Sequence, residues 1–178
     1  MIPMISEHQS LDLDVRRRIY NCIVESPGLH FREIQRRTAL ATGSIDYHLH
    51  FLHKNGLIRI ERDKNYARYY PLTKNWSEEE KQILHLLRNE KMRHIIIFLI
   101  SKKKSTPLKI SEATAISLST LSWYLKQLQE KGIVNQTKKG RFRIYRINEP
   151  KKLVEYLIAY KTSFLDVVVD RFIETWDF

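Results

Sequence analysis

The sequence predicts a mainly α-helical protein with small β-hairpins, built from two similar domains in tandem and a C-terminal helical segment. Three observations support this fold class. Apolar residues recur at helical spacing along most of the 178 residues. Two long segments match each other without a gap when the sequence is shifted by 76 residues, so that Gly56 falls on Gly132. Each segment also ends in two short alternating runs around a polar turn, which is typical of a hairpin.

The first copy predicts three helices followed by the hairpin. The first helix begins at Asp12 or Asp14, either of which can cap it, and it ends at Pro27. Gly56 stands where the third helix needs a left-handed C-cap. The remaining expected elements of this copy are helices at about 31–38 and 42–55 and strands at 57–60 and 67–70.

The second copy repeats this order, with expected helices at 91–100, 107–113 and 118–131 and expected strands at 133–137 and 142–147. Helix, helix, turn, helix and hairpin is the order of a winged helix-turn-helix domain. We therefore expect a winged helix in residues 1–72, a linking helix in 73–89, a second winged helix in 90–149 and a C-terminal helical segment in 150–178. The linking helix begins with a capping box over Ser77-Glu-Glu-Glu80.

The composition indicates a polyanionic partner. The formal net charge is +11 and the sequence pI is about 9.8. Residues 102–149 hold 11 Lys and Arg against 3 Asp and Glu, residues 12–72 hold 11 against 7, and residues 150–178 hold 4 against 5. Positive charge is thus concentrated in the two copies, and the C-terminal segment is unsuited to following a phosphate backbone.

Other features exclude several classes of protein. Cys22 is the only cysteine, which excludes a fold built on internal disulfides. We expect a cytoplasmic protein, because the first residues lack a signal-peptide pattern and no apolar run is long enough for a membrane span. Gly-rich phosphate loops and hydrolase or zinc-protease motifs are also absent, so we expect neither an enzyme nor a cofactor.

Two motifs of the first copy resemble the archaeal tandem winged helix-turn-helix transcription regulators, a group related to the ArsR-like winged helices. The motifs are Pro27-Gly-Leu-His-Phe-Arg-Glu-Ile34 and Gly43-x-x-x-Tyr47-His48-Leu49-x-x-Leu52-x-x-x-Gly56-Leu57-Ile58. The second copy departs from the pattern, with Trp123-Tyr124 for the Tyr-His pair and Lys103-Lys104 for Pro-Gly. The resemblance spans nearly the whole chain and implies a DNA-binding regulator of transcription. The family includes an activator of archaellum genes.

The third helix of a winged helix enters the major groove, and residues near its N-terminus reach the base edges. Small hydroxyl residues there let the backbone approach the DNA, although they also cap helices in any protein. Asp46 either accepts a hydrogen bond from a cytosine amino group or faces away from the DNA. The expected base contacts are Thr42, Gly43, Ser44, Asp46, Tyr47 and His50 in the first copy and Ser119, Thr120, Ser122, Trp123 and Lys126 in the second.

The hairpins, or wings, carry charge of predominantly one sign, which favours contact with phosphates over ordinary protection of exposed strands. A run of three lysines before the second copy's short helix is either a further phosphate contact or a solvated loop. The expected phosphate contacts are Arg59, Arg62, Lys64 and Arg68 in the first wing, Lys138, Lys139, Arg141 and Arg143 in the second, and Lys102, Lys103 and Lys104 before the short helix.

We expect the protein to form a homodimer through its C-terminal segment. The apolar residues of this segment lie on one helical face, and that face is left uncovered because the three helices of each copy can already enclose a core. The alternative is that this face packs onto the second winged helix of the same chain. The residues concerned are Leu153, Leu157, Tyr160, Phe164, Val167, Phe172 and Trp176.

The sequence therefore predicts a sequence-specific, double-stranded DNA-binding transcription regulator, with the basal transcription factors as further possible partners. One alternative is a protein-interaction adaptor of the transcription machinery, which a neutral or acidic wing surface would favour. Another is a repressor that responds to a metal or metabolite. His50 and His53 are three residues apart, yet no cysteine or carboxylate accompanies them at metal spacing, so no metal site is expected. His48 is expected to pack against its domain.

Overall fold

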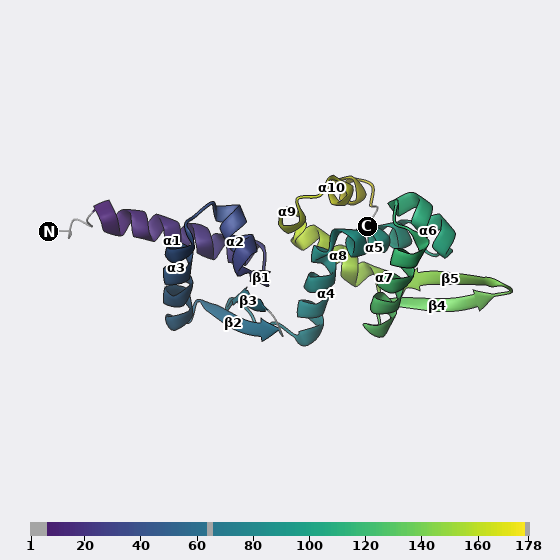
Figure 1. Ribbon diagram of the computed structural model, residues 1–178, viewed down its shortest axis with the longest axis horizontal. Helices are drawn as coiled ribbons and strands as arrows, with labels where there is room; N and C mark the ends of the chain where they lie inside the picture. Colours follow the sequence, from purple (N-terminus) through teal and green to yellow (C-terminus); the bar gives the residue numbers. More distant parts are fainter. Residues whose placement is uncertain (1–6, 64–65, 177–178) are drawn as a thin grey trace. The chain divides into compact units, whose positions relative to one another are not determined.

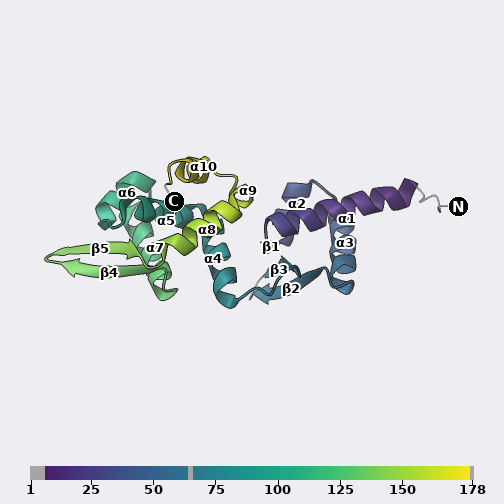
Figure 2. The ribbon, with the colours of Figure 1, turned by 180° about the vertical axis from the view of Figure 1, so that it is seen from behind.

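The computed structural model describes residues 7–63 and 66–176, and the chain forms two compact units that divide between Lys81 and Gln82. Each unit contains one copy of the helix, helix, helix and hairpin order (Figures 1 and 2). The fold is mainly helical with small antiparallel hairpins, as the sequence predicts. None of the described helices is both long and apolar enough to span a membrane.

In the first unit, α1 begins at Glu7, earlier than the predicted start at Asp12 or Asp14, because residues 7–11 contain no Gly or Pro that would stop a helix. The sheet has the order β1-β3-β2, with antiparallel pairing throughout. The elements are α1 (Glu7–Glu25), β1 (Leu29–His30), α2 (Phe31–Thr38), α3 (Thr42–Lys54), β2 (Ile58–Asp63), β3 (Tyr66–Pro71) and the start of α4 (Glu78–Arg88).

The predicted capping box opens α4: the Ser77 N–H donates to Glu80 Oε2 at 2.9 Å, and the Glu80 N–H donates to Ser77 Oγ at 3.2 Å. The second unit takes the rest of α4 and has a two-stranded sheet. Its further elements are α5 (Glu90–Lys102), α6 (Pro107–Thr114), α7 (Leu118–Glu130), β4 (Val134–Lys139), β5 (Phe142–Ile147), α8 (Pro150–Ala159), α9 (Lys161–Phe164) and α10 (Val167–Glu174).

The duplication is visible in the backbone. Each of α2, α3, β2 and β3 has the same length as α6, α7, β4 and β5 and begins 76 residues earlier. Ala39 and Ala115 end the second helix of each copy in the same left-handed conformation, with φ of 52° and 54°. Leu29 pairs with Tyr69 as Ser105 pairs with Tyr145. The two copies therefore share one fold down to single backbone conformations.

Each unit has its own core. In α3 the buried residues Ile45, Leu49 and Leu52 point inward, and Leu121, Leu125 and Leu128 do the same in α7. The cores differ at the first helix. The middle of α1 buries Ile19 and Ile23, whereas α5 buries apolar residues around most of its circumference, including the run Ile95-Ile96-Ile97. A helix that is apolar on all sides needs cover on all sides.

The C-terminal segment supplies that cover. Leu153, Leu157 and Phe172 lie in the core of the second unit, and Phe164 and Trp176 pack against it. Figures 1 and 2 both show α8 and α10 beside α5. The expectation that three helices leave this apolar face spare is wrong for these buried side chains, because α5 is too apolar for α6, α7 and the hairpin to enclose. Of the seven predicted dimer residues, Val167 has its side chain mainly in solvent, at 63% exposed.

A buried ion pair fastens the segment to α5. Arg93 is 4% exposed, and its Nε donates to Asp166 Oδ2 at 2.7 Å while its Nη1 donates to the carbonyl oxygen of Leu87 at 2.7 Å. His94 Nε2 lies 2.9 Å from the same carboxylate oxygen. Burial alone would raise the pKa of Asp166, but hydrogen bonds from Arg93, the Val168 N–H and His94 outweigh it and hold the pKa below its usual 3.8.

Candidate nucleic-acid interface

The third helix of each copy exposes the residues predicted to contact bases. On α3, Thr42, Gly43, Asp46 and His50 are exposed and Ser44 is half-buried. On α7, the exposed residues are Ser119, Ser122, Trp123 and Lys126, and Thr120 is half-buried. The opposite face of each helix carries the buried leucines and isoleucines of its core. The fold therefore holds the predicted base contacts on the outer side of two rigidly packed helices.

Each of these helices presents one large aromatic residue to solvent at the same position of the repeat. Tyr47 is 57% exposed and Trp123 is 55% exposed. Each ring meets the edge of the ring that follows it, with Tyr47 and His48 centroids 5.0 Å apart and Trp123 and Tyr124 centroids 4.9 Å apart. His48 is buried, which confirms that it packs against its domain. The inner ring thus orients the outer one.

The polar groups near the two helix N-termini differ in their partners. Ser117 caps α7 by accepting from the Thr120 N–H at 3.4 Å, and Ser122 Oγ donates to the Leu118 carbonyl at 2.8 Å. Ala41, the N-cap of α3, makes no side-chain cap. The first N–H groups of α3 therefore remain more available to an anionic partner.

Asp46 lies close to the first hairpin. Burial, followed by the negative charge of Asp46, raises the pKa of the Tyr69 hydroxyl above its usual 10, and Arg62 acts in the opposite direction. The Asp46 side chain itself is exposed on α3. A carboxylate in this position repels phosphate, which limits how the backbone of a nucleic acid can pass the first copy.

Among the described residues of the first wing, two cations have partners within the chain. Arg68 is half-buried and donates through Nη1 to the Gly28 carbonyl at 3.1 Å, which gives it a structural role. Arg59 Nη1 lies 3.8 Å from Glu61 Oε1, and the same oxygen accepts from Lys81 Nζ at 2.7 Å. Arg62 is exposed. Lys64 lies outside the described residues.

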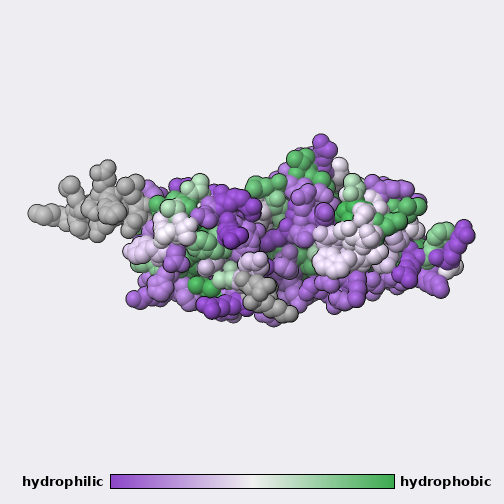
Figure 3. Space-filling view, viewed as in Figure 1, coloured by the Kyte–Doolittle hydropathy of each residue, from purple (hydrophilic) through white to green (hydrophobic). Residues whose placement is uncertain are grey.

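The second wing keeps its cations in solvent. Lys138, Lys139, Arg141 and Arg143 are all exposed, and no described carboxylate forms an ion pair with any of them. Lys138 and Arg143 are cross-strand partners, so their charges lie side by side on one face of the hairpin. The Arg141 guanidinium lies 5.2 Å from the centroid of the Phe142 ring. In Figure 3 the far end of this hairpin is mainly hydrophilic with a small hydrophobic spot.

The three lysines at the end of α5 are exposed as well. Lys102 lies in the last turn of α5, where the helix dipole favours a positive charge. Lys103 is the C-cap with φ 61°, and its N–H donates to the Ile100 carbonyl at 3.2 Å. These lysines stabilise the helix end whether or not they also contact phosphate.

The histidines of α3 do not converge. His50 is exposed, and His53 Nδ1 lies 3.2 Å from the Ile58 carbonyl oxygen. Among the described residues, no three His, Cys, Asp or Glu side chains come together as a metal site would need. His30 caps α2 in a capping box with Glu33.

The comparisons with known proteins agree with this architecture. The family described as the HVO_0163 N-terminal HTH domain matches residues 13–84, and the family described as winged helix-turn-helix DNA-binding matches residues 88–135. Each match falls on one copy of the repeat, and together they cover both third helices.

Similar proteins come from curated sequences and solved structures. An uncharacterized HTH-type transcriptional regulator of Methanocaldococcus jannaschii, MJ1398, is 31% identical over 148 residues, which are 83% of this chain and 37% of that protein. The chain thus spans little more than a third of that relative. The crystal structure of an ArsR family transcriptional regulator is 20% identical with a TM-score of 0.38, and the match covers 49% of this chain and 91% of that one. The two family matches, one on each copy, show that the chain carries two helix-turn-helix domains in tandem, and it is similar to an HTH-type transcriptional regulator.

Proposed function

We propose that this chain binds double-stranded DNA sequence-specifically and thereby regulates transcription, with α3 and α7 in the major groove and the β4–β5 wing on the phosphate backbone. The observation that carries the proposal is the second wing, whose four cations are exposed and have no described carboxylate partner. Unpaired cations on an exposed hairpin suit a polyanion, whereas a protein-interaction adaptor would favour a neutral or acidic wing.

Base readout is assigned to the outer faces of α3 and α7. Their exposed hydroxyl and aromatic side chains can approach base edges closely. The ring of Trp123, for example, can contact a thymine methyl group. Phosphate contacts fix the position of a protein on the duplex, and base contacts give it specificity. The proposal divides these roles between the wing and the helices.

The test is selection of preferred duplexes from a random pool, followed by titration of affinity against salt on selected and unselected duplexes. We expect a clear preference for selected sequences and a steep loss of affinity as salt rises, because each phosphate contact releases counterions. Steep salt dependence without any sequence preference would leave only nonspecific binding and would contradict the regulator proposal.

A homodimer is a further part of the proposal. Since Leu153, Leu157 and Phe172 are buried in their own unit, the surface left for a second copy in this segment is Leu165, Val167 and Val168, which are 81%, 63% and 40% exposed. We expect Leu165→Lys with Val167→Lys to give a folded monomer by light scattering, whereas Lys151→Ala leaves the mass unchanged. A full-length chain that is already monomeric at micromolar concentration excludes the dimer.

A further inference from the structure

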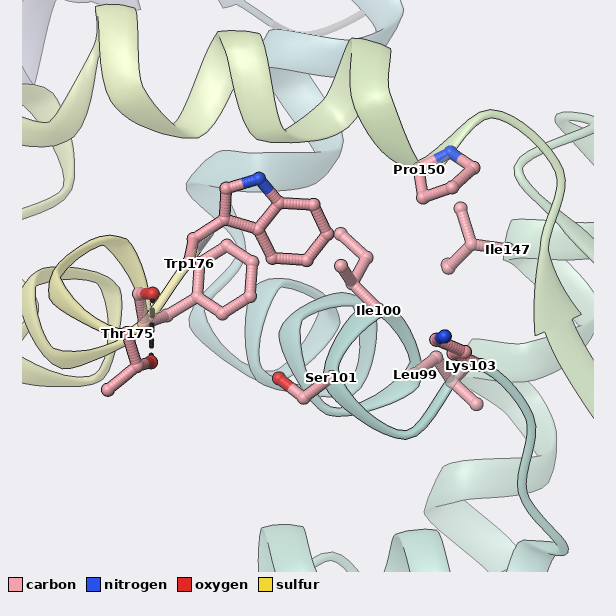
Figure 4. Close-up of a pocket in the computed structure, with 9 residues that line it drawn as sticks. Leu99, Ile100, Ser101, Lys103, Ile147, Pro150, Thr175 and Trp176 are labelled. Carbon is pink, nitrogen blue, oxygen red and sulfur yellow. Dashed lines mark hydrogen bonds between the residues drawn. The ribbon is translucent and has the colours of Figure 1, made fainter. Parts of the chain in front are cut away.

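A pocket of about 610 Å³ opens in the second unit between the end of α5, the end of β5 and α10 (Figure 4). This volume is within the range of small-molecule sites. Part of its wall is α10, which has no counterpart among the described helices of the first unit. It is separate from the outer faces of α3 and α7.

One side of the pocket is apolar and aromatic. Ile100 and Ile147 contribute aliphatic side chains, and the rings of Phe172 and Trp176 lie together with centroids 5.3 Å apart. Figure 4 shows Ile100 close to the edge of the Trp176 ring. Phe172 is 6% exposed while Trp176 is only partly buried, so the indole forms the accessible part of this wall. Such a wall suits the flat apolar body of a ligand.

The polar side of the pocket is cationic. Lys103 lines it, no described carboxylate forms an ion pair with Lys103, and no lining residue is acidic. The two hydroxyl groups in the lining are already donating to helix carbonyls: Ser101 Oγ to Ile97 at 2.9 Å, and Thr175 Oγ1 to Arg171 at 3.0 Å. The one charged group offered to a ligand here is therefore a single ammonium.

The backbone of Lys103 has an unusual conformation. Lys103 has φ 61°, in the left-handed region that side chains other than glycine rarely adopt. The corresponding residue of the first copy is Pro27, whose ring restricts φ to negative values. The two copies therefore differ in backbone conformation at this position. As at Ala39, Ala115 and Leu165, the residue with positive φ directly follows the end of a helix.

We propose that the pocket binds a small aromatic monocarboxylate, with the carboxylate paired to Lys103 and the ring against Trp176 and Phe172. One ammonium matches one negative charge, and a phosphate would need more donors than the lining provides. Lys103 also belongs to the lysine run proposed to contact DNA phosphates. A bound carboxylate would neutralise it, and this regulatory consequence, unlike the binding itself, rests on the proposed function.

The experiment uses phenylacetate as the probe and the indole N–H signals of the three tryptophans as the readout, in nuclear magnetic resonance spectra of the full chain without DNA. Trp176→Phe assigns the Trp176 signal. We expect phenylacetate at millimolar concentration to shift that signal saturably and to leave the Trp76 and Trp123 signals in place. The absence of a saturable shift would overturn the proposal.

Two comparisons test the role of charge. Phenylacetamide, the neutral analogue, should bind about fivefold more weakly, and Lys103→Gln should weaken phenylacetate binding by a similar factor. Lys102→Gln removes a neighbouring exposed charge that does not line the pocket, so it should leave the affinity unchanged. Equal losses in both variants would show a general charge effect and would contradict the site. Because DNA is absent, failure of the proposed function cannot cause either result.

Discussion

The two copies place corresponding arginines in opposite environments. Arg17 in α1 and Arg93 in α5 occupy the same position of the repeat, 76 residues apart. Arg17 forms a solvent-exposed pair with Asp14 three residues away, with 72% and 57% of the two side chains exposed. Arg93 pairs with Asp166, far along the sequence, and these side chains are 4% and 9% exposed. The two copies share their element order, but in the second copy the C-terminal segment buries the arginine that is exposed in the first.

The wings differ in the same systematic way. The first wing commits Arg68 to a backbone carbonyl and Arg59 to Glu61, and the third helix beside it carries Asp46. The second wing leaves its cations in solvent, whereas Lys126 on α7 lies 3.9 Å from Glu130. The difference suggests a division of labour, in which the second copy supplies most of the electrostatic affinity and the first contributes proportionally more discrimination between sequences.

The largest expected effect separates Arg93 from Arg17. Arg93→Ala leaves the Asp166 carboxylate buried without its guanidinium, so we expect the free energy of unfolding to fall by about 3–5 kcal/mol. Arg17→Ala removes an exposed pair and should cost less than about 1 kcal/mol. Chemical denaturation of the full chain measures both. Similar losses in the two variants would mean that the buried pair does not anchor the segment.

Acid should weaken the same anchor. Because the pKa of folded Asp166 is lowered, its contribution to stability is complete above the unfolded value near 3.8 and is lost as pH falls through the folded pKa. We therefore expect the second unit to lose stability below about pH 4. Asp166→Asn, which can still cap α10, should be less stable at neutral pH and should lose less on acidification. The measurement is the denaturation midpoint of the unchanged protein and of Asp166→Asn across this pH range. Parallel curves for the two proteins would exclude a contribution of Asp166 ionisation to stability.

These contacts show which parts of the molecule the sequence can predict. The repeat, the elements and most exposed positions of α3 and α7 follow from local periodicity and turn residues, because they depend on neighbours within a few residues. The Arg93–Asp166 pair joins residues 73 apart, and no local pattern marks either one. The run Ile95-Ile96-Ile97 was the available signal: it is too apolar for a helix covered on one side, which points to cover by the C-terminal segment.

The candidate site was predicted less completely than the fold, for a related reason. The sequence alone does not distinguish Arg68 from Arg143. Arg68 donates to the carbonyl of Gly28, 40 residues away, whereas Arg143 is exposed to solvent. Strand alternation gives the face of a side chain, but a long arginine finds its partner through tertiary contacts. Charge in the sequence therefore does not tell which cations have partners within the chain, and the phosphate contacts of both wings stay predictions.

The wings provide the next prediction. Arg141→Ala with Arg143→Ala should lower affinity for all duplexes alike by about tenfold and should reduce the salt slope by about two, because two phosphate contacts are lost. Arg59→Ala with Arg62→Ala should have a smaller effect, since Arg59 already faces Glu61. Binding isotherms at several salt concentrations compare the pairs. Equal losses from both wings would refute the division of labour.

The smallest effect on affinity, and the sharpest test of the comparison, concerns Tyr47. Its ring is 57% exposed on α3, so Tyr47→Ala should leave thermal unfolding nearly unchanged. If the first copy contributes mainly discrimination, this variant should lower the ratio of specific to nonspecific affinity, by about 1 kcal/mol for a lost base contact, while its affinity for unselected DNA stays the same. Tyr47→Phe is the matched control: it keeps the ring and removes the hydroxyl, and so separates apolar contact from hydrogen bonding. The wing variant should show the reverse pattern, with affinity lost and the ratio kept. A Tyr47→Ala protein that loses affinity equally for every sequence would show that α3 acts as a backbone contact, and the two copies would then differ only in strength.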